Sequence, residues 1–115
     1  MSVKLTTRQV NDVTVIDAVG RITLGEGAST FRDTIRDLAQ GGHKKVLLNL
    51  SEISYIDSSG IGELVSGFTT VTNHGGNLKL LGLSKRVKDL LQITKLYTVF
   101  EVYDDEAEAV RSFGA

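Results

Sequence analysis

Small hydroxyl and glycine residues are concentrated in one short segment of the chain, Asp57-Ser58-Ser59-Gly60-Ile61-Gly62. The segment lies between an apolar, strand-like run and a stretch whose apolar residues recur with helical spacing. A serine at such a junction is close to unpaired backbone N–H groups and to the positive end of the helix dipole, and both favour a phosphate group. We therefore expect the chemistry of this chain to take place in this segment.

Acyl-transfer catalysis at Ser58 would require a general base near the hydroxyl and an acid that orients this base. His43 and His74 both lie in predicted loops beside Gly-Gly pairs, and the segment lacks the Gly-x-Ser-x-Gly pattern of a nucleophile elbow. We interpret both histidines as solvated loop residues. The sequence accordingly predicts no catalytic residue and no enzyme.

Nucleotide binding is a second alternative, because glycine-rich turns before helices bind phosphates. The third small position of a Gly-x-Gly-x-x-Gly pattern falls on Val65 after Gly60 and on Thr30 after Gly25, and neither segment ends as a P-loop does. The chain has no cysteine, which excludes a cysteine-based zinc site. We expect neither a cofactor nor a metal.

Helix capping is the structural explanation of the same segment, because Asp and Ser are preferred N-cap residues. A cap needs only one such residue, however, and three follow one another from Asp57 to Ser59. Gly60 and Gly62 would each cost about 1 kcal/mol of helix propensity. We interpret the two glycines as leaving room for a partner protein or a modifying enzyme that lies over the loop.

Length and composition indicate one soluble globular domain over residues 1–115, with 41% hydrophobic and 23% charged residues. The net charge of −1, without a basic stripe, argues against a nucleic-acid partner. The N-terminus lacks the apolar core of a signal peptide, and no apolar stretch is long enough to span a membrane. Together with the absence of cysteine, these features favour a cytoplasmic protein.

Alternating strand-like and helical patterns predict the elements that position the segment. Strands are expected at 5–10, 13–19, 45–50, 78–82 and 97–103, and helices at 28–39, 61–71, after Ser84 and after Asp105. Asn11-Asp12 suits a hairpin turn, and the aliphatic run at 45–50 suits a central strand that is buried on both faces. Because strands that alternate with helices form parallel crossovers, the predicted fold class is α/β, with a mixed, mostly parallel sheet of about five strands, about four helices and an N-terminal hairpin.

The segment from Ser54 to Gly62, together with the strand before it, resembles the STAS domains of bacterial anti-sigma factor antagonists, also called anti-anti-sigma factors. The resemblance covers nearly the whole chain, and Asp-Ser-Ser-Gly-Ile-Gly is its specific part. Weaker matches are Gly20-Arg21-Ile22, Gly75-Gly76-Asn77-Leu78, Val87-Lys88-Asp89-Leu90-Leu91 and Thr94-Lys95-Leu96. The resemblance implies a single STAS domain.

The same resemblance implies a switch in which the unphosphorylated antagonist binds an anti-sigma factor that is also a serine kinase, so that the sigma factor is released. The modified serine of the family follows the Asp and corresponds to Ser58, and a phosphatase would restore the active form. Many family members carry an acidic residue where this chain has Thr23. The residues expected to bind the partner are Arg21, Thr23, Asp57, Ser58, Ser59, Gly60, Ile61 and Gly62.

A different class of function is a STAS module that acts as a constitutive scaffold or as a docking subunit of a signalling or transport complex. The segment around Ser58 would then be a docking surface, and the serine would stay unmodified.

Overall fold

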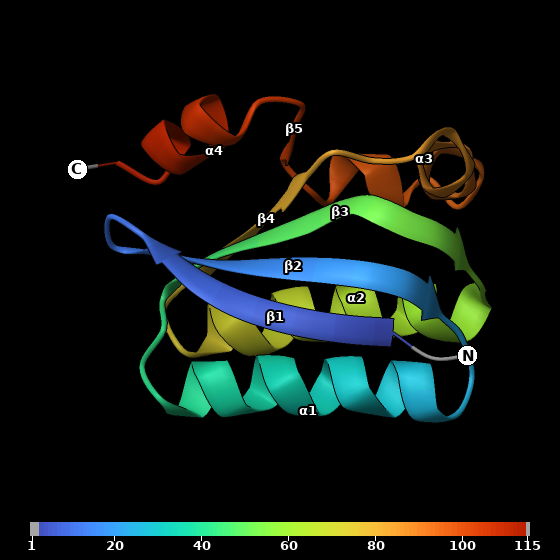
Figure 1. Ribbon diagram of the computed structural model, residues 1–115, viewed down its shortest axis with the longest axis horizontal. Helices are drawn as coiled ribbons and strands as arrows, with labels where there is room; N and C mark the ends of the chain where they lie inside the picture. Colours follow the sequence, from blue (N-terminus) through green and yellow to red (C-terminus); the bar gives the residue numbers. More distant parts are fainter. Residues whose placement is uncertain (1–2, 115) are drawn as a thin grey trace.

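The computed structural model describes residues 3–114. A five-stranded sheet lies between two layers of helices, with α1 and α2 on one face and α3 and α4 on the other (Figure 1). The elements in chain order are β1 (Val3–Val10), β2 (Val13–Ile22), α1 (Glu26–Gln40), β3 (Lys45–Ile56), α2 (Ser58–Asn73), β4 (Asn77–Leu81), α3 (Lys85–Ile93), the 3₁₀ helix η1 (Leu96–Thr98), β5 (Val102–Tyr103) and α4 (Glu106–Ser112).

The strands follow the order β1-β2-β3-β4-β5, so that β3 is central. β1 and β2 form an antiparallel hairpin, and the other neighbouring strands are parallel. Asn11 adopts a φ of 56° in the hairpin turn, a conformation that asparagine tolerates well. The predicted fold class, with its mixed sheet and N-terminal hairpin, is confirmed.

The aliphatic residues in the first half of β3 are buried on both faces of the sheet. Leu48 belongs to a large apolar cluster with Phe31 of α1 and Leu64 of α2. The adjacent residue Leu47 faces the other side of the sheet and belongs to a second cluster with Val110 of α4. This arrangement explains the continuous aliphatic run, because a strand that is covered on both faces needs apolar residues at consecutive positions.

The predicted strand over 97–103 is wrong for most of its length. Lys95 adopts a left-handed φ of 63° and the chain turns through η1, so that only Val102 and Tyr103 pair with β4. Phe100 is buried instead against Phe68 of α2, with ring centroids 5.5 Å apart in an edge-to-face arrangement. Phe100 therefore anchors this segment at the edge of the sheet, whereas Tyr97 and Val99 remain exposed.

β2 and β3 are longer than predicted and end side by side. Their last residues, Ile22 and Ile56, are partners in the parallel register and are both buried. The strands extend past the predicted ends because they pair with each other through two register shifts, near Asp17 and near Gly20. The loop from β2 to α1 and the start of α2 consequently meet at the same end of the sheet, where β2 and β3 finish.

Candidate functional site

Ser58 is the first residue of α2, and its side chain is exposed. Within residues 3–114 its hydroxyl group forms no hydrogen bond. The helix is capped by the preceding residue, because Asp57 Oδ1 accepts a hydrogen bond of 2.9 Å from the backbone N–H of Gly60. Since Asp57 performs the capping, the hydroxyl of Ser58 is left free for chemistry.

Asp57 also connects two segments that are distant in the sequence. Its Oδ2 atom accepts a hydrogen bond of 3.0 Å from the backbone N–H of Leu24, in the loop between β2 and α1. Its own backbone N–H donates to the carbonyl oxygen of Ile22 at 3.3 Å. The N–H groups of Leu24 and Gly60 lower the pKa of Asp57, so that the carboxylate is ionised when it holds the two loops together.

Gly60 has a different role from the one that the sequence suggests. A Cβ atom at this position would lie 2.2 Å from the carbonyl oxygen of Ile22 and 2.5 Å from Cγ1 of Ile56. The close approach is thus between the first turn of α2 and the chain's own strand ends, not between the loop and a partner. Gly60 and Ile61 are buried and support the site from inside, whereas Gly62 is exposed with open space around it.

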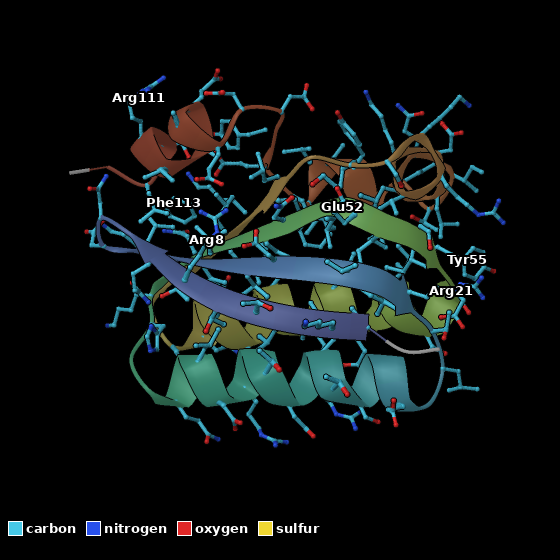
Figure 2. All side chains as sticks on the ribbon, in the orientation of Figure 1. Arg8, Arg21, Glu52, Tyr55, Arg111 and Phe113 are labelled. Atoms are coloured by element: carbon cyan, nitrogen blue, oxygen red, sulfur yellow. The ribbon has the colours of Figure 1, made fainter. Side chains whose placement is uncertain are left out.

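The other residues expected to bind a partner lie around Ser58 with different degrees of exposure. Thr23 is half-buried in the loop that Asp57 holds, and Ser59 is half-buried in the first turn of α2. Arg21 is exposed near the end of β2, where its register partner is Tyr55 of β3. Arg21 and Tyr55 lie at one end of the sheet, and Arg8, Arg111 and Phe113 lie toward the other (Figure 2).

Two apolar residues that the sequence did not single out flank the site. Leu24 is 79% exposed and Ile93 is 78% exposed, the highest values for large apolar side chains in the described part of the chain. Leu24 is next to the carboxylate of Asp57, and Ile93 lines a groove that also reaches Ser58. Because Leu24 stands outside any periodic apolar pattern, the sequence did offer a signal for it.

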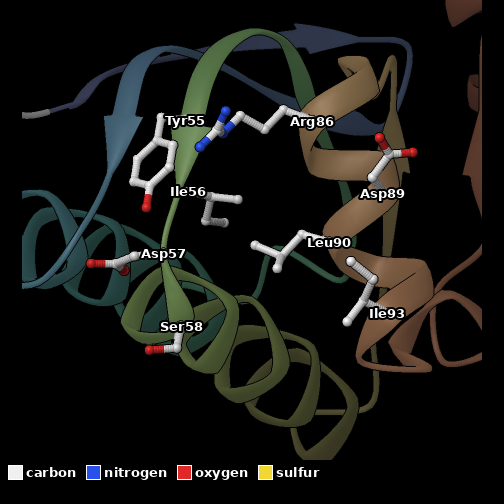
Figure 3. Close-up of a pocket in the computed structure, with 8 residues that line it drawn as sticks. All are labelled: Tyr55, Ile56, Asp57, Ser58, Arg86, Asp89, Leu90 and Ile93. Atoms are coloured by element: carbon white, nitrogen blue, oxygen red, sulfur yellow. The ribbon is translucent and has the colours of Figure 1, made fainter.

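The groove has a volume of about 460 Å³ and lies between the end of β3, the start of α2 and one side of α3 (Figure 3). Ile56, Leu90 and Ile93 give it an apolar lining, and Ser58 lies at one end. At the other end the guanidinium group of Arg86 lies 4.7 Å from the centre of the Tyr55 ring.

Neither histidine lies near the serine. His74 is the C-cap of α2, at the opposite end of this helix from Ser58, and its Nδ1 lies 2.8 Å from the carbonyl oxygen of Thr70. His43 precedes β3, at the far end of this strand from Asp57, and its Nδ1 lies 2.9 Å from Oγ1 of Thr14. Neither histidine is therefore placed to act as a base for Ser58.

Two structural features are absent from residues 3–114: a cluster of candidate metal ligands and a long apolar helix. No group of three or more His, Cys, Asp or Glu side chains in this range is arranged to hold a metal ion. None of the helices in the same range has the length and apolar character needed to cross a membrane.

Comparison with known proteins relates the whole fold to a family. A family model described as STAS domain matches residues 4–109. The anti-sigma-B factor antagonist of Bacillus subtilis is 30% identical over 102 residues, which are 89% of this chain and 92% of that protein. The crystal structure of tm1081 from Thermotoga maritima is 25% identical, with a TM-score of 0.88 over 96% of this chain and 95% of that one.

SpoIIAA has a similar fold in two chemical forms. Its unphosphorylated form is 21% identical with a TM-score of 0.72, and the match covers 97% of this chain and 100% of the SpoIIAA chain. The phosphorylated form from Bacillus is also 21% identical, with a TM-score of 0.74 over 95% of this chain and 98% of that one. From the matched family model and the B. subtilis relative together, the chain belongs to the STAS domain family.

Proposed function

We propose that this chain is a cytoplasmic anti-sigma factor antagonist that is switched by phosphorylation of Ser58. The unphosphorylated form binds an anti-sigma factor that is also a serine kinase, and the sigma factor is thereby released. Phosphorylation of Ser58 ends this binding, and a phosphatase restores it. The chain is the substrate of these enzymes and has no catalytic role of its own.

The observation that carries the proposal is the setting of the Ser58 hydroxyl. It is exposed and unbonded within the described residues, and it follows a residue that already caps the helix. The B. subtilis relative is an anti-sigma-B factor antagonist, and SpoIIAA has been solved in its unphosphorylated and its phosphorylated form. The first supports an antagonist role, and the second supports control of such a role by phosphorylation.

A phosphate on Ser58 is compatible with the fold. It adds about −1.5 to −2 charges at the N-terminus of α2, where the helix dipole favours negative charge. The effect of the modification is then on the partner, because a surface packed against Ser58 would have to desolvate the new charge. A loss of only about 1.4 kcal/mol already weakens binding tenfold.

The exposed side chain of Leu24 supports a protein partner at this site. Isolated apolar side chains on a polar surface are common, but the backbone of this residue is bonded to Asp57, which directly precedes Ser58. Apolar anchors at the centre of an interface supply much of the binding energy. Leu24 thus extends the partner-binding surface beyond the residues that the sequence suggested.

The test is to incubate the protein with its cognate anti-sigma factor kinase and ATP and to locate the phosphate by mass spectrometry. We expect one phosphate on Ser58, none on a Ser58→Ala variant, and full modification of the matched Ser59→Ala variant. The affinity of the kinase for Ser58→Asp should fall by about tenfold or more, since the carboxylate imitates part of the added charge.

Phosphate on another residue, or an unchanged affinity for Ser58→Asp, would contradict the proposal. If Ser58→Ala and the wild type also behave alike in cells, the chain is an unmodified scaffold or docking subunit.

A further inference from the structure

The groove beside Ser58 carries positive charge that no carboxylate of the described residues neutralises. Its lining includes Arg86, and a smaller hollow of about 360 Å³ continues it past Tyr55 to Arg21. Within residues 3–114 neither arginine forms an ion pair or a side-chain hydrogen bond. In contrast, Arg8 on the sheet and Arg32 and Arg36 on α1 each pair with a carboxylate.

The acidic residues of the groove are already engaged. Asp57 accepts backbone N–H groups with both of its carboxylate oxygens. Asp89 accepts a hydrogen bond of 3.0 Å from Nζ of Lys85, one turn earlier on α3. The charges that remain available to a ligand are therefore the two guanidinium groups.

Arg86 is also held in an orientation that suits a carboxylate. Its guanidinium group stacks over Tyr55 and points from α3 toward the end of β3 (Figure 3). A guanidinium group that lies over an aromatic ring forms no hydrogen bond with it through all of its N–H groups, and those that remain are available for a bidentate bond with a carboxylate. Between this cation and Ser58 the groove offers Ile56, Leu90 and the exposed Ile93 to an apolar side chain.

We infer that the groove binds a segment of the anti-sigma factor partner that carries an apolar side chain next to an acidic one. The apolar side chain packs on Leu90 and Ile93, and the carboxylate binds Arg86, with Arg21 behind it. This inference rests on the function proposed above and specifies the chemistry of the partner.

The same arrangement explains how phosphorylation could release the partner. Ser58 lines the same groove at the end away from Arg86, so that a phosphate there adds negative charge to the groove that receives the acidic segment. Like charges that are brought together in an interface oppose binding, and the repulsion adds to the cost of desolvating the phosphate. The partner's acidity would thus make the switch more effective.

The first experiment compares Arg86→Glu with Lys88→Glu by isothermal titration against the cognate anti-sigma factor kinase. The two variants have the same charge change on the same helix, but Lys88 is exposed and lines no part of the groove. We expect Arg86→Glu to weaken binding by about tenfold or more and Lys88→Glu by less than about twofold. Equal effects of the two variants would overturn the inference.

Arg86→Gln separates charge from packing, because it keeps a polar side chain of similar reach. Its affinity should lie between those of the wild type and Arg86→Glu, and it should depend less on salt than that of the wild type. Wild-type affinity and wild-type salt dependence in Arg86→Gln would contradict a role for the charge.

A second experiment does not need the kinase. ¹H–¹⁵N spectra of the protein are recorded with a short peptide that contains leucine flanked by glutamates, and with a matched peptide in which glutamines replace the glutamates. We expect the glutamate peptide to shift the amide signals of Tyr55 and Ile93 more strongly at equal concentration. Equal shifts, no shifts, or shifts confined to other surfaces would refute the groove assignment.

The two proposals fail in different ways. If Ser58 is phosphorylated but Arg86→Glu binds the kinase as Lys88→Glu does, only the groove assignment is wrong. If the kinase neither binds nor modifies the chain while the glutamate peptide occupies the groove, the proposed function is wrong, and the groove retains its preference for an acidic and apolar segment but loses the anti-sigma factor as its partner. Sedimentation equilibrium detects another occupant, because a dimer that Arg86→Glu dissociates would assign the groove to a second copy of the chain.

Discussion

At the scale of single residues, Asp57 and Gly60 maintain the backbone conformation of the site. The carboxylate of Asp57 accepts the N–H groups of Leu24 and Gly60, which closes the helix end and fixes the neighbouring loop. Gly60 lets the first turn of α2 lie directly against the carbonyl oxygen of Ile22. Because these two residues maintain the backbone, Ser58 can change its chemical state without losing a structural contact.

Ser58→Asp should therefore alter partner binding much more than stability. We expect the free energy of unfolding to stay within about 0.5 kcal/mol of the wild type, because the favourable helix terminus offsets repulsion from Asp57. Urea unfolding measures this quantity, and Ser58→Ala serves as the control for loss of the hydroxyl. A loss of more than about 2 kcal/mol would mean that the modification acts by unfolding the domain.

Gly60→Ala and Gly62→Ala form a matched pair in the same helix. The added methyl group at Gly60 would overlap the backbone of Ile22, and we expect a loss of stability of at least about 1–3 kcal/mol, as for other overpacked sites. At Gly62 no described atom outside the adjacent residues and the local helix backbone lies within 4 Å of the new Cβ, and alanine should stabilise the helix by about 0.5–1 kcal/mol. Urea unfolding distinguishes the two, and equal effects would contradict the packing argument.

At the scale of elements, α3 and α4 cover the same face of the sheet but have different roles (Figure 1). α3 borders the groove beside Ser58, and α4 closes the second apolar cluster near the hairpin. α4 has only seven residues, from Glu106 to Ser112, too few for a stable isolated helix. Its position must therefore be secured by contacts with the sheet.

Lys79 of β4 provides one of these contacts, although it is only 7% exposed. Its Nζ donates to the carbonyl oxygen and to Oγ of Ser112, both at 3.0 Å, and lies 4.7 Å from the centre of the Phe113 ring. We expect Lys79→Met to accelerate amide hydrogen exchange in α4 by about tenfold and to leave α2 nearly unchanged, because the lost bonds are local.

The control for this measurement is Lys88→Met, which removes an exposed lysine from α3. Equal acceleration of exchange in α2 and α4 of the Lys79→Met variant would show that the whole fold is destabilised, and the local role of Lys79 would then be wrong.

At the scale of the whole molecule, Arg8 joins the first and last elements of the chain. Its guanidinium group on β1 bonds to Asp17 of β2 at 2.6 Å and to Glu106 at the start of α4. Asn49 of β3 donates a further hydrogen bond of 2.9 Å to Asp17. The hydrogen bonds from Arg8 are the main cause that lowers the pKa of Asp17 and of Glu106.

This network makes stability depend on pH in a definite direction. The two carboxyl groups have lower pKa values in the folded chain than their ordinary values of 3.8 and 4.5. Their stabilisation is therefore complete above these ordinary values and is lost as the pH falls through the lowered ones. Arg8→Met should be less stable than the wild type by about 1 kcal/mol at pH 7, since all three side chains are partly exposed, and the difference should shrink below about pH 4.

Urea unfolding as a function of pH tests this prediction. Arg36→Met is the control, because Arg36 pairs with Asp33 and Asp37 on the exposed side of α1 and should change stability by less than about 0.5 kcal/mol. A difference between Arg8→Met and the wild type that stays constant down to pH 2 would contradict a contribution from the carboxylates.

The features that could be predicted from the sequence depend on interactions over a few residues. Asn11 marks the hairpin turn, and Ser84 and Asp105 cap the helices after them through bonds to the N–H groups of Val87 and Glu108. The aliphatic run of β3 indicates a central strand without any knowledge of its neighbours. The location of Ser58 at a helix start belongs to the same class, because the residues on both sides of it define the junction.

Only the tertiary structure decided what surrounds Ser58. The bond between Leu24 and Asp57 spans 33 residues, and the groove requires α3 to lie beside the end of β3. The role of Gly60 was misjudged from the sequence because the atom that it approaches, the carbonyl oxygen of Ile22, belongs to a distant strand. Local patterns fix turns, caps and the faces of elements, whereas the neighbours of a surface residue depend on strand register and on packing between elements that are far apart in the chain.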